Sequence, residues 1–328
     1  MVRVLPHAVS ATPSTDVQRL RASFDSGATR SLAFRGEQLR KLGSSLQRNE
    51  AALLDALRSD LGKSAHEAYA SELALIHAEI ETALRNLHRW AAPSRRRTTW
   101  LTWPSRAWVQ AEPLGVALII GPWNYPAQLL LVPLVSAIAA GNCVVLKPSE
   151  LAPRTADVIS ALIRETFADD FVIVVNGDAD VSAALLRERF DKIFFTGSTR
   201  VGRIVAAAAA RNLTPVTLEL GGKCPAVVCS DAEIEVAARR IAWGKFMNAG
   251  QTCVAPDHVF VARGARDAFL AALKRNIPRG EGRIVDRAQF DRLTSYLREG
   301  TIACGGGFDA ATLSIEPTIL TELGSDAA

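Results

Sequence analysis

The first third of the chain repeats apolar residues with the period of a helix. Leucines recur at steps of three and four over residues 39–61, and a second stripe of Leu and Ile runs through residues 65–90. This spacing places the apolar side chains on one face of a helix. Pro93 follows the second stripe, and proline cannot continue a helix. We therefore predict that residues 14–90 form a set of packed helices.

From Val116 onward, short apolar runs alternate with amphipathic stretches. This pattern predicts strands at 116–120, 143–147, 171–176, 192–196 and 216–220, with helices at 128–140, 155–167, 180–190 and 201–210. A second, shorter series predicts strands at 225–229 and 258–262 and helices at 233–247 and 267–276. Such alternation favours a mostly parallel sheet that helices cover on both faces.

The expected fold class is therefore α/β, in two domains. Residues 1–222 combine the N-terminal helices with a Rossmann-like, mostly parallel sheet, and residues 223–328 form a second α/β domain. Between the helices and the sheet, residues 98–113 interleave three tryptophans with Thr and Gln, which predicts an exposed β-ribbon. These tryptophans pack either on the body of the protein or on a partner subunit.

Residues 115–146 contain no charged side chain, which at this length is also typical of a membrane-spanning helix. Prolines and glycines divide the stretch into strand, turn, helix and strand, so a buried unit of a parallel sheet explains it better. The N-terminus has Arg3 but no long apolar core before a cleavage site, so we expect no signal peptide. We predict a cytoplasmic protein without a membrane anchor.

Composition and charge further limit the kinds of partner and site that the chain can have. The chain has 328 residues, 48% of them hydrophobic, and a net charge of +4, which suits a large core. The densest basic run, Arg95 to Arg97, lacks an aromatic-interleaved face; we interpret it as an exposed connector and predict no nucleic-acid partner. Five scattered cysteines lack the spacing of a disulfide framework or a zinc site, so no metal is predicted.

Two segments carry the residues of a covalent reaction. Cys253 lies in a turn of small residues that contains Gly250, and Glu219 lies 34 residues upstream at the end of an apolar strand. A thiol nucleophile and a nearby general base are what a two-step reaction through a sulfur adduct requires. Taken singly, each residue has a simpler reading, since most cysteines fill apolar cores and most glutamates are solvated.

A turn of small residues follows the strand predicted at 192–196 and opens a helix. It consists of Gly197, Ser198, Thr199, Arg200, Val201 and Gly202. The free N–H groups and the positive dipole end of a helix at such a turn suit a pyrophosphate. An ordinary capped turn between a strand and a helix has the same pattern.

Two further candidate sites follow strands of the same sheet. Lys147 and Glu150 come after the strand at 143–147, where they either hold ribose hydroxyls or an adenosine phosphate, or form a surface ion pair. Asn124 stands in a proline-stiffened turn after the strand at 116–120. Its amide suits an oxyanion donor, and equally suits the backbone of its own turn.

The order of five motifs resembles the aldehyde dehydrogenase superfamily. The motifs are GPWNYP at 121–126, KPSE at 147–150, GSTRVG at 197–202, LELGGK at 218–223 and FMNAGQTC at 246–253. The segments AWGKF at 242–246 and LTPVT at 213–217 look most like the class 3 branch, which includes fatty and aromatic aldehyde oxidisers. The resemblance extends over about residues 15–322.

The resemblance implies the oxidation of an aldehyde to a carboxylic acid. Carried over position by position, it makes Cys253 the nucleophile and Glu219 the general base for deacylation. It also makes Asn124 and the backbone N–H of Cys253 the donors that hold the oxyanion. Hydride then passes from the thiohemiacetal to a nicotinamide and leaves a thioester, which water hydrolyses.

The implied cofactor is NAD or NADP. By the resemblance, the turn from Gly197 to Gly202 meets the pyrophosphate, Lys147 and Glu150 meet the adenosine ribose, and Trp123 lies near the nicotinamide-side wall. An aldehyde is the expected small-molecule partner, and we predict a homodimer.

The sequence also departs from the family pattern. Arg200 and Cys224 stand where close relatives usually have a small residue and a serine. After Leu320 the family continues into a Glu-Glu-Ile-Phe-Gly-Pro motif, whose second Glu clasps the nicotinamide ribose, whereas this chain closes with residues 321–328. The resemblance is therefore to a C-terminally truncated member, and predicts an incomplete second domain with an open sheet edge and exposed apolar surface.

This departure leaves other functions open beside aldehyde oxidation. A truncated, redox-inactive paralogue would act as a partner subunit or persist as a remnant. Cys253 and Glu219 would also suffice for a thiol esterase, because acyl transfer to water needs only a nucleophile and a base.

Overall fold

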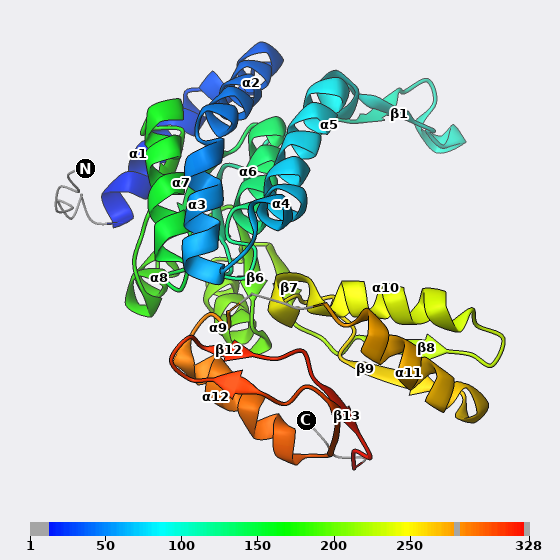
Figure 1. Ribbon diagram of the computed structural model, residues 1–328. Helices are drawn as coiled ribbons and strands as arrows, with labels where there is room; N and C mark the ends of the chain where they lie inside the picture. Colours follow the sequence, from blue (N-terminus) through cyan, green and yellow to red (C-terminus); the bar gives the residue numbers. More distant parts are fainter. Residues whose placement is uncertain (1–12, 279–282, 325–328) are drawn as a thin grey trace.

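The computed structural model of the protein describes residues 13–278 and 283–324 (Figure 1). Residues 1–12, part of the N-terminal segment for which we predict no signal peptide, lie outside these ranges. Residues 325–328 of the closing segment lie outside them as well.

The N-terminal region is helical, as the apolar spacing predicts. Its helices are α1 (Pro13–Asp25), α2 (Leu32–Arg48), α3 (Glu50–Leu61), α4 (Ala65–Ala68) and α5 (Ala74–Ala91), with a 3₁₀ turn at Ala28–Arg30. A wide π turn, Tyr69–Leu73, joins α4 to α5 and interrupts the single helix expected over 65–90. An apolar stripe does not reveal such a turn, because it changes the local hydrogen bonding and not the residue types.

A five-stranded parallel sheet forms the centre of the fold. Its strands are β3 (Val116–Ile120), β4 (Cys143–Lys147), β5 (Val172–Val174), β6 (Lys192–Gly197) and β7 (Val216–Leu220), in the order β5-β4-β3-β6-β7. The chain first adds strands on one side of β3 and then on the other, which is the Rossmann order for five strands. The predicted α/β class and parallel sheet are confirmed. Ligands of such sheets bind at the carboxyl ends of the strands near the reversal, here between β3 and β6.

Four helices connect these strands. They are α6 (Gln128–Ala140), α7 (Pro153–Thr166), α8 (Ala179–Leu185) and α9 (Thr199–Ala210). Helix α8 is shorter than the 180–190 predicted, because the N–H groups of Arg187 and Glu188 bond to carbonyls three residues back and form tight turns. In Figure 1, α3 of the N-terminal region lies beside α7.

The uncharged stretch of residues 115–146 forms β3, α6 and β4, and every residue of both strands is buried. The buried sheet unit predicted for this stretch is therefore confirmed. Within the described ranges, no helix combines the length and apolar character needed to span a bilayer.

Two carboxylates of the N-terminal region cap helices of the sheet domain. Asp60 accepts both the backbone N–H and the hydroxyl of Thr155, each at 2.8 Å, at the start of α7. Glu72 accepts the backbone N–H groups of Ala127 (2.9 Å) and Gln128 (3.1 Å) at the start of α6. A negative charge is stabilised there by the unpaired N–H groups and the helix dipole. These caps fasten the N-terminal helices to the sheet.

A second α/β unit follows, with the predicted elements. It contains the parallel strands β8 (Pro225–Val228) and β9 (His258–Val261) and the helices α10 (Ile234–Phe246) and α11 (Arg266–Asn276). Val228 and Phe269 belong to its own apolar core, separate from that of the sheet. Val227 and Phe260, by contrast, are 69% and 61% exposed. The domain boundary near residue 222 stays a prediction.

The last described segment is built from short elements. They are α12 (Arg287–Ser295), the 3₁₀ turn Tyr296–Arg298, β10 (Thr301–Cys304), β11 (Phe308–Asp309), β12 (Ser314–Ile315) and β13 (Ile319–Thr321). Three further 3₁₀ turns lie earlier in the chain, at Trp100–Thr102, Met247–Gly250 and Arg263–Ala265. Strand β10 pairs with β13 and β11 with β12, both antiparallel.

The β-ribbon is present but begins earlier than predicted. Its strands are β1 (Ser94–Arg96) and β2 (Ala107–Val109), with Arg95 opposite Trp108. Arg95 and Arg96 of the basic run thus lie in the first strand, because cross-strand pairing stabilises a short strand without an apolar pattern. All three arginines of the run are exposed, as predicted. The ribbon projects from the body in Figure 1. Trp100 and Trp103 are 84% and 80% exposed, so they do not pack on the body.

Candidate active site

The loop that carries Cys253 begins after α10 in an uncommon backbone conformation. Asn248 (φ 52°), Ala249 (φ 54°) and Gly250 (φ 79°) all adopt the left-handed region. Only glycine enters this region freely, so two consecutive non-glycine residues there need support from their surroundings. The Gln251 side chain supplies part of it, because its amide donates to the Asn248 carbonyl oxygen at 3.1 Å and closes the turn.

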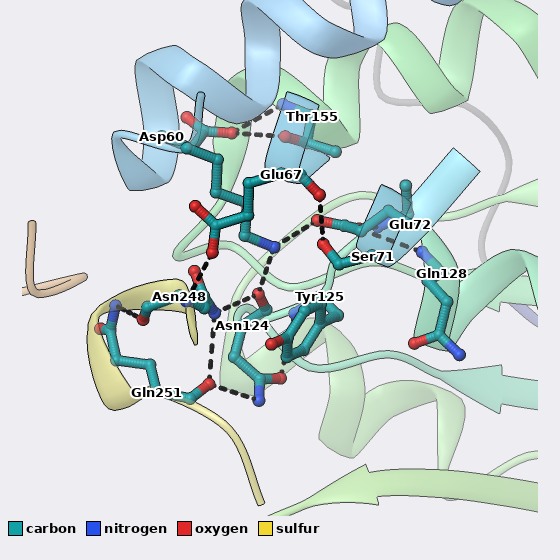
Figure 2. Close-up of polar contacts among 12 residues, drawn as sticks. Asp60, Glu67, Ser71, Glu72, Asn124, Tyr125, Gln128, Thr155, Asn248 and Gln251 are labelled. Carbon is teal, nitrogen blue, oxygen red and sulfur yellow. Dashed lines mark hydrogen bonds and ion pairs between the residues drawn. The ribbon is translucent and has the colours of Figure 1, made fainter. Parts of the chain in front are cut away.

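The turn after β3 meets this loop directly (Figure 2). The Asn124 side-chain amide donates to the Gln251 carbonyl oxygen at 3.0 Å, and the Asn248 amide donates to the Asn124 carbonyl oxygen at 2.8 Å. One residue further along each segment, the Tyr125 hydroxyl lies 2.6 Å from the Thr252 hydroxyl. The structure therefore brings the predicted oxyanion donor beside the cysteine loop.

Two donors at this junction keep a hydrogen free. The Asn124 amide nitrogen carries two hydrogens, and Gln251 takes only one of them. The backbone N–H of Cys253 has no acceptor among residues 13–278 and 283–324. A pair of free, fixed N–H groups beside a nucleophile is what an oxyanion site needs.

Cys253 is exposed and opens into a cavity of about 1080 Å³. Its lining includes the apolar and aromatic side chains of Tyr125, Leu129, Trp243 and Phe246. Cys143, by contrast, is fully buried in β4, and burial raises the pKa of its thiol to about 12. Because the thiolate is the nucleophilic form, Cys143 is unsuited to the role.

Glu219 lies at the carboxyl end of β7, with its side chain exposed. Across the described part of the chain, no hydrogen bond or ion pair engages its carboxylate, which leaves it able to accept a proton from water. The segment after β7 continues to the cysteine loop, where the Cys224 thiol donates to the Cys253 carbonyl oxygen at 3.2 Å. The two segments thus meet through Cys224, without a hydrogen bond between Glu219 and Cys253.

The turn after β6 has the features of a phosphate site. The Ser198 hydroxyl accepts a backbone N–H of the first turn of α9 at 3.3 Å, and Thr199 to Gly202 form that turn. A Cβ at Gly202 would lie 2.7 Å from Leu220, so glycine lets α9 approach β7 closely. Thr196, just before the turn, has a buried hydroxyl with no partner in the described residues. An unpartnered hydroxyl and free N–H groups fit an anionic cofactor.

The two candidates after β4 form an ion pair. Lys147 is 1% exposed, and its ammonium donates to a backbone carbonyl oxygen at 2.7 Å and to the Glu150 carboxylate at 3.1 Å. The Glu150 side chain is half-exposed. The ion pair named as one alternative is therefore present, and contact with a ribose stays a prediction.

Trp123 is half-buried and lies near the cysteine loop. It lines a second cavity, of about 810 Å³, together with Gln251 and Gly250. Its place at the nicotinamide-side wall stays a prediction.

The sequence patterns did not identify the two buried residues, Lys63 and Glu72, that contact the Asn124 turn. Lys63 and Glu72 are 1% and 0% exposed and lie 2.5 Å apart, and Lys63 also donates to the Asn124 carbonyl oxygen at 3.0 Å. Burial lowers the pKa of Lys63 and raises that of Glu72, while their mutual attraction opposes both shifts. The one signal in the sequence is a glutamate beside Leu73 of the apolar stripe.

The aldehyde dehydrogenase family profile matches residues 5–328. This chain belongs to the aldehyde dehydrogenase family. Aldehyde dehydrogenase family 3 member A2 of Rattus norvegicus is 45% identical over 317 residues, which cover 94% of this chain and 66% of that protein. The dimeric NADP-preferring aldehyde dehydrogenase of the same species is 43% identical over 320 residues, covering 94% and 71%. The resemblance to the class 3 branch is confirmed.

A solved aldehyde dehydrogenase shares the fold of this chain. The substrate-bound state of Staphylococcus aureus AldH matches with a TM-score of 0.93 and 41% identity, over 97% of this chain and 72% of that one. The chain thus spans about two thirds of the length of the curated relatives it matches.

Proposed function

We propose that this chain oxidises an aldehyde to a carboxylic acid, with NAD or NADP as the hydride acceptor. The observation that carries the proposal is the junction of the Asn124 turn with the Cys253 loop beside an open cavity. Membership of the aldehyde dehydrogenase family and the NADP-preferring relative support it.

The reaction begins at the cysteine loop. The Cys253 thiolate attacks the aldehyde carbon, and the carbonyl oxygen becomes an alkoxide. The free hydrogen of the Asn124 amide and the Cys253 N–H hold this oxygen. A bound nicotinamide would supply the hydride acceptor. Loss of hydride from the tetrahedral carbon leaves a thioester on Cys253.

Hydrolysis of the thioester completes the cycle. Glu219 takes a proton from water, and the hydroxide attacks the acyl carbon. The C–S bond breaks, the carboxylic acid leaves, and Cys253 regains its thiolate. An exposed carboxylate without a partner suits this step, because it has freedom to approach the water.

The cofactor would be held at the carboxyl ends of the central strands. The turn from Gly197 to Gly202 would meet its pyrophosphate at the N-terminus of α9, and exposed Arg200 adds a positive charge there. Lys147 and Glu150 would meet the adenosine ribose, and Trp123 the nicotinamide side.

The lining of the Cys253 cavity bears on the choice of aldehyde, and the exposed tryptophans of the β-ribbon bear on the oligomeric state. The apolar and aromatic lining of the Cys253 cavity favours an aliphatic or aromatic aldehyde. The tryptophans of the projecting ribbon are exposed, which favours a homodimer in which the ribbon is covered. A cytoplasmic location stays a prediction from the sequence.

The direct test is aldehyde-dependent reduction of the cofactor. We expect purified chain, mixed with NAD or NADP and an aliphatic or an aromatic aldehyde, to produce reduced cofactor, followed by its absorbance. Activated ester, added without cofactor, measures thiol esterase activity in the same preparation.

The outcomes separate the three candidate functions. Ester hydrolysis that is indifferent to NAD, with no reduced cofactor, would favour the esterase. Absence of both activities, while an alkylating reagent still labels Cys253, would favour the redox-inactive paralogue and refute the proposal.

A further inference from the structure

A buried ion pair lies behind the turn that carries Asn124. The Lys63 ammonium and the Glu72 carboxylate are 2.5 Å apart and almost fully buried. Removing two charges from water is costly, so such a pair persists only where further hydrogen bonds satisfy it. Here the π turn Tyr69–Leu73 carries Glu72 into the interior, and π turns often occur at functional sites.

The further hydrogen bonds of this pair all go to one short segment, residues 124–128. Lys63 donates to the Asn124 carbonyl oxygen at 3.0 Å, and its ammonium lies 4.0 Å from the centre of the Tyr125 ring. Glu72 accepts the N–H groups of Ala127 and Gln128 with its second oxygen. The pair therefore holds the segment at both ends; Figure 2 shows Glu72 beside Gln128 at one of them.

The same segment supports the cysteine loop from the other side. The Asn124 amide and the Tyr125 hydroxyl contact Gln251 and Thr252, which directly precede Cys253. A displacement of residues 124–128 would therefore move the oxyanion donor relative to the thiol. A shift of about 1 Å at such a donor costs roughly 100-fold in rate.

We propose that Lys63 and Glu72 are positioning residues, which act through Asn124 to set the oxyanion donor against Cys253. This inference rests on the proposed function for its kinetic readout. In the proposed mechanism neither residue bonds to a reacting atom, although Lys63 contributes to the lining of the Cys253 cavity. Their contribution is to fix the position of the Asn124 amide before the alkoxide forms.

A double-mutant cycle tests this inference. Asn124→Ala is expected to lower kcat/KM by roughly 100- to 1000-fold, and Lys63→Met by roughly 10- to 100-fold. If Lys63 acts through Asn124, adding Lys63→Met to Asn124→Ala should cost less than about 3-fold more. Glu72→Gln, which keeps the side-chain volume, should behave in the same way and serves if Lys63→Met does not fold.

Asp60→Asn is the matched control. Asp60 is also a buried carboxylate that caps a helix, but its cap is on α7 and does not reach residues 124–128. The Asp60→Asn substitution should change kcat/KM only slightly, even if it lowers the melting temperature. In the double variant, its fold-change in kcat/KM should multiply with the fold-change caused by Asn124→Ala. If the fold-losses of kcat/KM caused by Lys63→Met and Asn124→Ala multiply completely in the double variant, the inference is overturned.

A second readout separates this inference from the proposed function. If the chain oxidises no aldehyde, a crystal structure of the Lys63→Met variant still decides the positioning role. We expect the Asn124 amide to lose its hydrogen bond to Gln251 in that structure. An Asn124 turn that stays in place would refute the inference whatever the activity.

An independent observation concerns Cys224, which approaches the nucleophile. Its thiol lies 3.2 Å from the Cys253 carbonyl oxygen, and its backbone N–H donates to the Asp257 carboxylate at 3.0 Å. The Asp257 N–H in turn donates to the Cys224 carbonyl oxygen at 3.2 Å. These contacts hold Cys224 against the loop, and Cys253 itself is exposed.

We infer that Cys224 and Cys253 form a disulfide when the protein meets hydrogen peroxide. The Cys253 thiolate attacks the peroxide O–O bond, which leaves a sulfenic acid and releases hydroxide. The Cys224 thiol then attacks that sulfur, the S–O bond breaks, and water leaves. Overall, two thiols and one peroxide give one disulfide and two waters, and a reductant reverses the change.

Peptide mass spectrometry after peroxide treatment tests the disulfide, with Cys224→Ser as the matched variant. We expect wild-type protein to yield a peptide pair joined through Cys224 and Cys253, and dithiothreitol to restore alkylation of Cys253. The variant should instead accumulate irreversible sulfinic acid at Cys253. Equal sulfinic acid in both proteins, without the joined peptides, would refute the inference and leave the proposed function untouched.

Discussion

Replacing Cys253 by serine is expected to lower aldehyde oxidation by roughly 10⁴-fold or more, because a serine hydroxyl stays protonated at neutral pH and is a weak nucleophile. The loss should appear in kcat, since the variant keeps the apolar cavity and the oxyanion donors. The measurement is the rate of reduced-cofactor formation at saturating aldehyde, with intact-protein mass to detect any acyl adduct.

Cys229→Ser is the matched control for this prediction. Cys229 is exposed, as Cys253 is, but it follows β8. It should keep wild-type turnover, and both variants should melt near the wild-type temperature. Full turnover in Cys253→Ser would exclude the covalent mechanism.

Replacing Glu219 by glutamine is expected to separate the two halves of the reaction. The glutamine cannot take a proton from water, so the thioester should form and then persist, with steady-state turnover reduced by roughly 10²- to 10⁴-fold. Rapid mixing should show a burst of reduced cofactor close to one equivalent per site. Intact-protein mass should show the acyl group on the enzyme.

Glu112→Gln is the control, because Glu112 is an exposed glutamate between β2 and β3. It should leave both the burst and the steady state unchanged. Wild-type steady-state turnover in Glu219→Gln would remove Glu219 from the deacylation step and leave the nucleophile role of Cys253 intact.

Local sequence patterns predicted the central elements closely. Strand β3 and helix α6 have the bounds expected from their apolar runs, and Gly141, which adopts φ 87°, caps the end of α6. These elements are buried and their boundaries are marked by residues with special backbone freedom. The β-ribbon was placed late because its first strand is exposed and arginine-rich, and only pairing with β2 defines it.

The residues of the candidate site also fall into two groups, those that the sequence predicts and those that only the structure reveals. Cys253, Glu219 and Asn124 stand in motifs at strand or helix ends, where the chemistry of each residue type is visible without a structure. Lys63 and Glu72 have no such mark. Each is a single charged residue in a helical region, where most charged residues are solvated. Their role depends on a π turn and on a segment about 60 residues away in the chain.

The sequence by itself determined the α/β class, the order of the elements and the family, because these follow from periodicity, residue chemistry and motif order. It also predicts Cys253 as the nucleophile. Only the tertiary structure decided which side chains lie around the site: the Asn124 turn against the cysteine loop, the buried Lys63–Glu72 pair beside that turn, and Cys224 beside Cys253. The physical reason is distance along the chain. Hydrogen bonds between segments far apart in sequence exist only once packing brings them together, and no local pattern encodes which partner each will meet.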